Sequence, residues 1–230
     1  MDTAFDIILR SMEGKGVQRV IVDRLNCDWG YSKLTYGRIE GSRLVADLDL
    51  EGGVWKVELT GGTFQQNWLE DFQIVKAALT VSPTGIEVGE LSLKLGKGSL
   101  KLTGKVGGPA SKPDVQLSGE FKHLAIGDLL KLQGIQVREF LSGNISGTLK
   151  ISGSTDRVIR TEGKVVLDED DAITIRERWV VLKAISVLDL DRTYRRLDFD
   201  QGGFEFTTEG GEMTISGIQL SAKEFARLEG

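Results

Sequence analysis

The feature that most constrains this chain is the alternation of apolar and polar residues in short runs that end at glycine. Three alternate leucines over 91–95 are followed by Gly96-Lys97-Gly98-Ser99, and the alternation resumes over 100–102. A period of two places alternate side chains on opposite faces of a strand. A glycine-rich turn between two such runs is typical of an antiparallel hairpin.

The same pattern recurs along the chain and predicts a mainly β fold. A run over 46–51 turns at Gly52-Gly53 and continues over 55–59, and a run over 204–206 precedes a turn at Gly210-Gly211. The composition of 29 Gly and only 3 Pro agrees, because glycine permits turns and bends whereas proline cannot donate to a sheet ladder. We therefore expect a long, curled antiparallel sheet, taco-like, that forms a β-groove.

Three segments depart from the alternation and predict two or three short helices. They are Ala4–Met12, Gly127–Gln133 and Arg176–Leu190. Apolar residues in the first and third recur at helical spacing, although the valines of the third also suit a strand. One of these helices is expected to pack in the concave face of the sheet.

One glycine- and proline-rich joint divides the chain into two halves. It spans 107–113 and contains two of the three prolines. We expect an N-terminal β-groove half with a short leading helix over 1–108 and a C-terminal half over 114–230. A loop inside one continuous domain is the alternative.

Composition and charge exclude several classes of function. The formal net charge is −5, with one Cys and one His. A chain without a basic excess does not predict nucleic-acid binding, and these counts exclude a His/Cys zinc cluster and an intramolecular disulfide. The chain lacks a continuous apolar stretch of about 20 residues. We expect no cofactor.

The candidate catalytic and metal motifs have simpler interpretations. His123 is the only imidazole, no Gly-x-Ser-x-Gly sequence accompanies it, and we expect a surface or edge histidine. Asp47-x-Asp49-x-Glu51-Gly52 has the spacing of a calcium loop, but it is flanked by strand patterns instead of helices. The acidic run Asp168–Asp171 is interpreted as a solvated turn. We expect no metal site and no catalytic residue.

The order of several phrases in the second half resembles the C-terminal region of AsmA-like proteins of the bacterial envelope, which include the TamB type. These phrases are Val115-Gln-Leu-Ser-Gly-Glu-Phe121, Leu141-Ser-Gly-Asn-Ile-Ser-Gly-Thr-Leu-Lys-Ile-Ser-Gly153 and Gly211-Glu-Met-Thr-Ile-Ser-Gly-Ile-Gln-Leu-Ser221. The resemblance covers about residues 114–222. It implies a repeating β-groove in a protein that faces the periplasm from the inner membrane.

The resemblance implies a role in phospholipid traffic or outer-membrane biogenesis. We expect a non-enzymatic module that binds or conducts phospholipid along its apolar groove, or that is a scaffold for envelope proteins. Any membrane association would come from an anchor in a longer parent protein, of which this chain would be a fragment. The predicted lining residues share strand parity: Leu91, Leu93, Leu95, Leu100, Leu102, Val115, Leu117, Phe121, Ile145, Leu149, Ile151, Val165, Leu167, Phe204, Phe206, Met213 and Ile215.

Three alternatives remain open on the sequence alone. The lining residues equally suit the closed core of an ordinary β-sandwich. A carbohydrate- or protein-binding β-sandwich predicts a surface cluster of Trp29, Trp55 or Trp68. A β-solenoid hydrolase predicts that Asp47 and Asp49 converge with Asp168–Asp171.

Overall fold

All fifteen elements of the described chain are β-strands, as the alternation predicts. The computed structural model describes residues 16–32, 35–51, 53–66, 69–108, 114–127, 141–154, 159–168, 171–176, 196–209, 212–222 and 226–229. In chain order the strands are β1 (Arg19–Ser32), β2 (Thr35–Asp49), β3 (Val54–Thr60), β4 (Thr63–Gln66), β5 (Leu69–Ser82), β6 (Gly85–Leu95), β7 (Gly98–Gly107), β8 (Asp114–Ala125), β9 (Leu141–Ser154), β10 (Arg160–Val166), β11 (Ala172–Arg176), β12 (Arg196–Phe199), β13 (Gln201–Glu209), β14 (Glu212–Ala222) and β15 (Ala226–Glu229).

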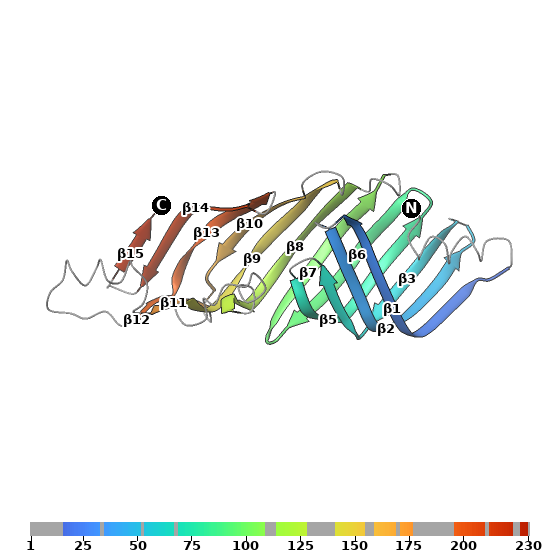
Figure 1. The fold of residues 1–230 in the computed structure, drawn as a ribbon, viewed down its shortest axis with the longest axis horizontal. Coiled ribbons are helices and arrows are strands. Elements are labelled where there is room, and N and C mark those ends of the chain that lie inside the picture. The colour runs from blue at the N-terminus through green and yellow to red at the C-terminus, as the bar shows by residue number, and fades with distance from the viewer. Residues whose placement is uncertain are drawn as a thin grey trace.

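The strands form one antiparallel sheet whose order follows the chain. The continuous path is β1-β2-β3-β5-β6-β7-β8-β9-β10-β13-β14-β15. β3 and β4 pair with successive parts of both β2 and β5, so they are two parts of one strand interrupted at Gly61-Gly62. β11 pairs with β9 and β12 beside the main path. Figure 1 shows the strands side by side across the long axis, in a twisted and curved sheet.

The predicted hairpins are present with the predicted parity. β6 and β7 flank the turn at 96–97, and β2 and β3 flank the turn residues 50, 51 and 53. Leu93 lies opposite Leu100, and Leu100 lies opposite Phe121 on the next strand. Directly opposed residues of an antiparallel pair point to the same face. The apolar residues of successive strands therefore form one face, which we call the apolar face, and their polar alternates form the polar face.

Phase shifts in the alternation are absorbed by β-bulges. In β6 the apolar parity changes between Val88 and Leu91, and the ladder to β7 shifts register between these residues. In β8 the change falls between Phe121 and Leu124, again at a register shift. A bulge inserts one extra residue into a strand, so the apolar side chains that follow it point to the same face as those before it. The apolar face therefore stays continuous where the sequence slips by one residue.

The apolar face carries the hydrophobic core. Val57, Leu93 and Val165 lie on three separated strands, and each is at most 1% exposed. They belong to one cluster that spans the sheet from Leu44 to Ala222. Because a flat layer leaves both faces in water, burial this complete indicates that the chain curves around its apolar face.

Glycines on the apolar face make room for large neighbours. A Cβ placed on Gly163 would lie 2.3 Å from ring atoms of Phe206, the residue opposite on β13. A Cβ on Gly147 would lie 2.7 Å from Cζ of Phe121. Aromatic rings that cover cross-strand glycines stabilise a sheet and allow it to bend. The high glycine content therefore serves this face as well as the turns.

The predicted helices fall largely outside the described residues. Ala4–Met12 lies outside them entirely, Gly127–Gln133 is described only at Gly127, and Arg176–Leu190 is described only at Arg176, the last residue of β11. Gly127 follows Ile126 in helical conformation. The predicted joint between the two halves lies between β7 and β8. On either side of 109–113 these strands pair with each other without a break, from Ser99 opposite Lys122 to Gly107 opposite Asp114.

Substitution of Gly147 tests the role of glycine on the apolar face. In Gly147→Ala the new Cβ would lie 2.1 Å from the carbonyl oxygen of Lys164 on β10. This contact cannot be relieved without moving the ladder, so we expect the free energy of unfolding to fall by about 1–3 kcal/mol in urea denaturation. In the control Gly89→Ala, the nearest atom is 3.5 Å away, and a change within about 0.5 kcal/mol is expected. Equal effects would contradict this packing role.

Candidate functional site

The structure places all seventeen predicted lining residues on the apolar face. Seven are buried in the core: Leu93, Leu100, Leu102, Phe121, Ile145, Val165 and Leu167. Six are partly buried and pack against it: Leu91, Leu95, Leu117, Leu149, Phe204 and Phe206. The other four, Val115, Ile151, Met213 and Ile215, lie on the same face by register. Strand parity in the sequence therefore corresponds to one face of the sheet, and contact of these residues with lipid stays a prediction.

The face is uncovered toward the C-terminal strands. Met213 is 50% exposed and Ile215 is 48% exposed on β14. Ile215 lies opposite Phe206, and the same row continues through Gly163 to Leu149 on β9. An apolar row thus begins in the buried core and ends in solvent. Exposed apolar surface that continues a core is typical of a site that binds another apolar group.

The N-terminal strands supply lining residues that the sequence prediction omitted. Leu44, Val57 and Phe72 are at most 3% exposed and belong to the same core cluster. The alternation over 46–59 that predicted the first hairpin also carries this signal. The apolar face is therefore a property of the whole sheet and not of the second half alone.

A histidine–aspartate pair lies at the bulge of β8. Nδ1 of His123 is 3.0 Å from Oδ1 of Asp171, whose side chain has no exposed surface. The backbone N–H of His123 donates to Oγ of Ser146 on β9 at 3.1 Å. The bulge frees this N–H from the ladder, and Ser146 satisfies it. The pair therefore ties β8 to the residues that precede β11.

Asp171 also closes its own turn. Its backbone N–H donates to the carbonyl of Asp168 at 2.9 Å, and its Oδ2 lies 3.4 Å from the backbone nitrogen of Asp168. A buried carboxylate needs such partners, because burial of an unpaired charge is costly. The interpretation of 168–171 as a solvated turn is therefore wrong for Asp171, although Asp168 is exposed. Residues 169 and 170 lie outside the described part.

The prediction of a surface or edge histidine for His123 is confirmed for the partly exposed surface and is wrong for the edge. β8 is an interior strand between β7 and β9, and the His123 side chain is 40% exposed. His123 has a positive φ of 51°, a conformation that non-glycine residues seldom adopt. The change of parity between Phe121 and Leu124 is a signal of the bulge that the sequence prediction did not use, and no local signal could identify the partner 48 residues away.

The described residues do not complete a catalytic arrangement around His123. Nucleophilic catalysis requires a hydroxyl or thiolate next to the imidazole. The Ser146 hydroxyl is bonded to the His123 backbone, and Cys27 lies on β1 at the far end of the sheet path. Burial, with the charge of Asp28, raises the pKa of the Cys27 thiol. A raised pKa disfavours the thiolate, which is the opposite of an activated nucleophile.

Among the residues that the structure describes, the acidic and tryptophan candidates do not assemble into a site. Asp47 and Asp49 lie on β2 and pair with Arg19 and Lys56, whereas Asp171 adjoins β11 at a distant place in the ladder. Within the described ranges, no three His, Cys, Asp or Glu side chains gather closely enough to hold a metal ion. Trp55 is only 6% exposed, which is unlike a surface sugar-binding tryptophan. The side chains of Trp29 and Trp68 lie outside the described part.

Comparisons with known proteins give no relative for this chain. Neither a protein-family model, nor a curated protein, nor a solved structure matches it. Among the residues that the structure describes, no helix has the length and apolar character needed to cross a membrane.

A double-mutant cycle tests the His123–Asp171 pair. His123→Ala leaves the buried Asp171 carboxylate without this partner, and we expect the free energy of unfolding to fall by about 1–3 kcal/mol. Comparison with Asp171→Ala and the double variant cancels effects of the unusual His123 backbone. A coupling energy of about 0.5 kcal/mol or more is expected. Additive effects, within about 0.3 kcal/mol, would show that the pair is not a stabilising contact.

Proposed function

We propose that this protein is a non-enzymatic module that binds an acyl chain, most simply that of a phospholipid, along its apolar face. The observation that carries the proposal is the uncovered end of that face at Met213 and Ile215, which are about half exposed. From Ile215 the apolar row continues through Phe206 and Gly163 to Leu149, which are partly buried. A flexible chain of methylene groups matches such a row because it needs no directional contact.

The energetics favour an apolar ligand of this kind. Each buried methylene contributes about 0.8 kcal/mol, so even partial burial of an acyl chain outweighs a substantial ordering cost. Glycines on the same face support the proposal. Gly147 and Gly163 have no side chain, so they leave the surface hollow beside the rings of Phe121 and Phe206. In this interpretation the curled sheet is a β-groove, and its C-terminal end is open to the ligand.

The resemblance of the second half to AsmA-like proteins supports a cellular location for this function. It implies action on the periplasmic side of the inner membrane, in lipid handling or in scaffolding of outer-membrane biogenesis, with envelope proteins as partners. The anchor would belong to a longer parent protein. The scaffold function needs no lipid, and retention of lipid by the purified chain distinguishes the two.

A pair of single substitutions tests lipid binding. Ile215 is 48% exposed on the apolar face, and Val166 is 43% exposed on the polar face. We expect Ile215→Asp to reduce lipid retention at least about tenfold, because a carboxylate beside an acyl chain loses its hydration. Native mass spectrometry after incubation with phosphatidylethanolamine vesicles gives the readout.

The matched control is Val166→Asp, which adds the same charge at similar exposure. Retention is expected to stay at the level of the unmodified chain. If Ile215→Asp and Val166→Asp reduce retention equally, the apolar face is not the binding surface. If the unmodified chain retains no lipid, the lipid-binding function is wrong and the scaffold function remains.

A further inference from the structure

The first strand of the sheet has an unpaired edge. β1 stands at one end of the strand order, and among the described strands it pairs with β2 alone. It runs for 14 residues, whereas β15 at the other end of the order has 4. An edge strand presents a row of backbone N–H and C=O groups without ladder partners, and these groups can pair with a strand of another molecule. We call this feature the β1 edge.

A bulge in β1 makes the facing of its side chains symmetric about one point. The ladder to β2 shifts register between Val22 and Leu25, and Asp23 and Arg24 between them are both exposed. The partly buried residues of the apolar face are Val20, Val22, Leu25 and Cys27. The exposed residues of the polar face are Arg19, Ile21, Asp23, Arg24, Asn26 and Asp28. From the bulge outwards, apolar and polar positions therefore follow in the same order in both directions.

This symmetry favours one register for the antiparallel pairing of two β1 edges. In that register Val22 of each copy lies opposite Leu25 of the other, and Val20 lies opposite Cys27. Every residue from 19 to 28 then lies opposite a residue of the same face. If one copy slides by one or two residues in either direction, apolar positions lie opposite polar ones. Such a mismatch turns apolar side chains towards water, so the facing of the side chains specifies the register.

The charged residues of β1 favour the same register. Arg19 of each copy lies opposite Asp28 of the other, and Asp23 lies opposite Arg24. A slide of four residues would instead place Arg19 opposite Arg24 in one direction, or Asp23 opposite Asp28 in the other. Opposite charges directly across a ladder stabilise an antiparallel pair, and like charges destabilise it. Facing and charge are independent properties of the strand, and they agree on one alignment of a second copy.

Arg24 gains a partner that the described chain does not supply. The other three charged residues each approach an opposite charge on β2, at 2.6–3.7 Å. In contrast, within the described ranges no carboxylate lies within 4.0 Å of the Arg24 guanidinium. The Asp23 side chain is 92% exposed, so its contact with β2 leaves it accessible to a second cation. Pairing of two β1 edges places these two groups opposite each other.

We infer that two copies of this chain pair antiparallel through their β1 edges, about a two-fold axis at the bulge. Charges and bulges on an edge strand normally prevent pairing with other chains. Here they disfavour other registers and are complementary in this one, which gives specificity for a second copy. The contact uses the same surface on both copies, so it closes as a dimer. The two apolar faces then lie on the same side of one sheet, and the pairing does not depend on lipid.

The native cysteine makes the register directly testable. In Val20→Cys the new thiol would lie opposite Cys27 of the other copy, at the Cα separation of about 4.5–5.5 Å that directly opposed residues have. This separation is within the range that a disulfide requires. The full chain is oxidised with copper phenanthroline. We expect Val20→Cys to form a disulfide-linked dimer, in which tandem mass spectrometry finds position 20 linked to position 27.

The matched control is Val22→Cys, on the same strand and the same face. Val22 lies opposite Leu25 of the other copy, so the new thiol is displaced from Cys27 by two residues, about 7 Å along the strand. We expect little linkage, because this displacement exceeds disulfide reach. Equal linkage of the two variants, or no linkage of Val20→Cys, overturns the inference.

Charge reversal tests the same pairing without a covalent bond. Arg24→Asp places a carboxylate opposite Asp23 of the other copy, and we expect association in sedimentation velocity to weaken at least about tenfold. Asp23→Arg/Arg24→Asp exchanges the two charges and restores opposite pairs, so association is expected to return to within about threefold of the unmodified chain. Equal weakening of both variants overturns the inference. So does an unmodified chain that stays monomeric up to about 500 μM, where even a small interface associates.

Discussion

The whole structure depends on the in-register pairing of each strand with the next, because this pairing keeps one set of side chains on one face. A slip of a single residue turns every following side chain to the opposite face. Over the path from β1 to β15 the apolar face nevertheless stays continuous. Bulges maintain it where the sequence changes phase, as between Val88 and Leu91 and between Phe121 and Leu124. The core and the exposed C-terminal end of the apolar face both follow from this alignment.

One sheet with two unlike faces separates two kinds of chemistry. On the apolar face, glycines without a side chain lie opposite large side chains, as Gly163 lies opposite Phe206. The polar face carries charged residues, some of them paired, such as Lys76 with Glu90 and Arg160 with Glu162. The His123–Asp171 pair lies at the bulge of β8, where the ladder to β9 shifts register.

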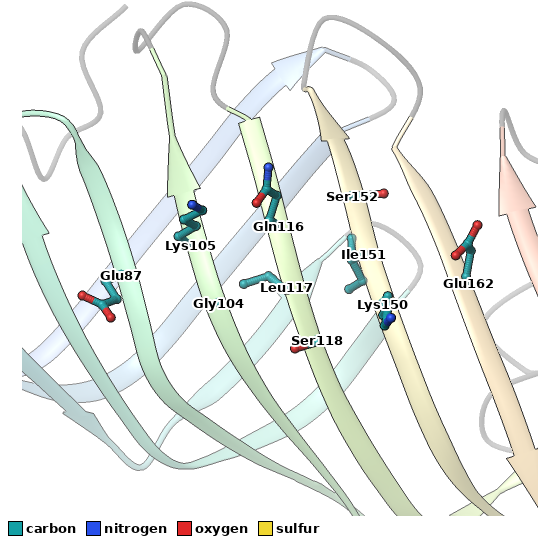
Figure 2. A pocket seen from close by; sticks show the side chains of 10 residues that line it. All are labelled: Glu87, Gly104, Lys105, Gln116, Leu117, Ser118, Lys150, Ile151, Ser152 and Glu162. Atoms are coloured by element: carbon teal, nitrogen blue, oxygen red, sulfur yellow. The ribbon is translucent and has the colours of Figure 1, made fainter.

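Period-two alternation was sufficient to predict the strands, the main hairpins and the membership of the apolar face, because these depend on neighbouring residues. The phase change after Phe121 also marks the bulge, although it does not identify its contacts. The burial of Asp171 was not predictable, since a run of four acidic residues normally lies in solvent and His123 is distant in sequence. Likewise, a shallow hollow of about 740 Å³ is lined by residues of five strands (Figure 2), so it depends on their register and no local pattern reveals it.

The central claim, that an acyl chain occupies the apolar face, is tested most directly by paramagnetic broadening of methyl signals. The protein is prepared with isotope-labelled Ile and Val methyl groups. Phosphatidylcholine that carries a spin label on its acyl chain is then added. The account predicts strong broadening at Ile215 and Ile151 on the apolar face, and little at Val166, which is 43% exposed on the polar face. Equal broadening at all three residues, or none at Ile215 and Ile151, would contradict it.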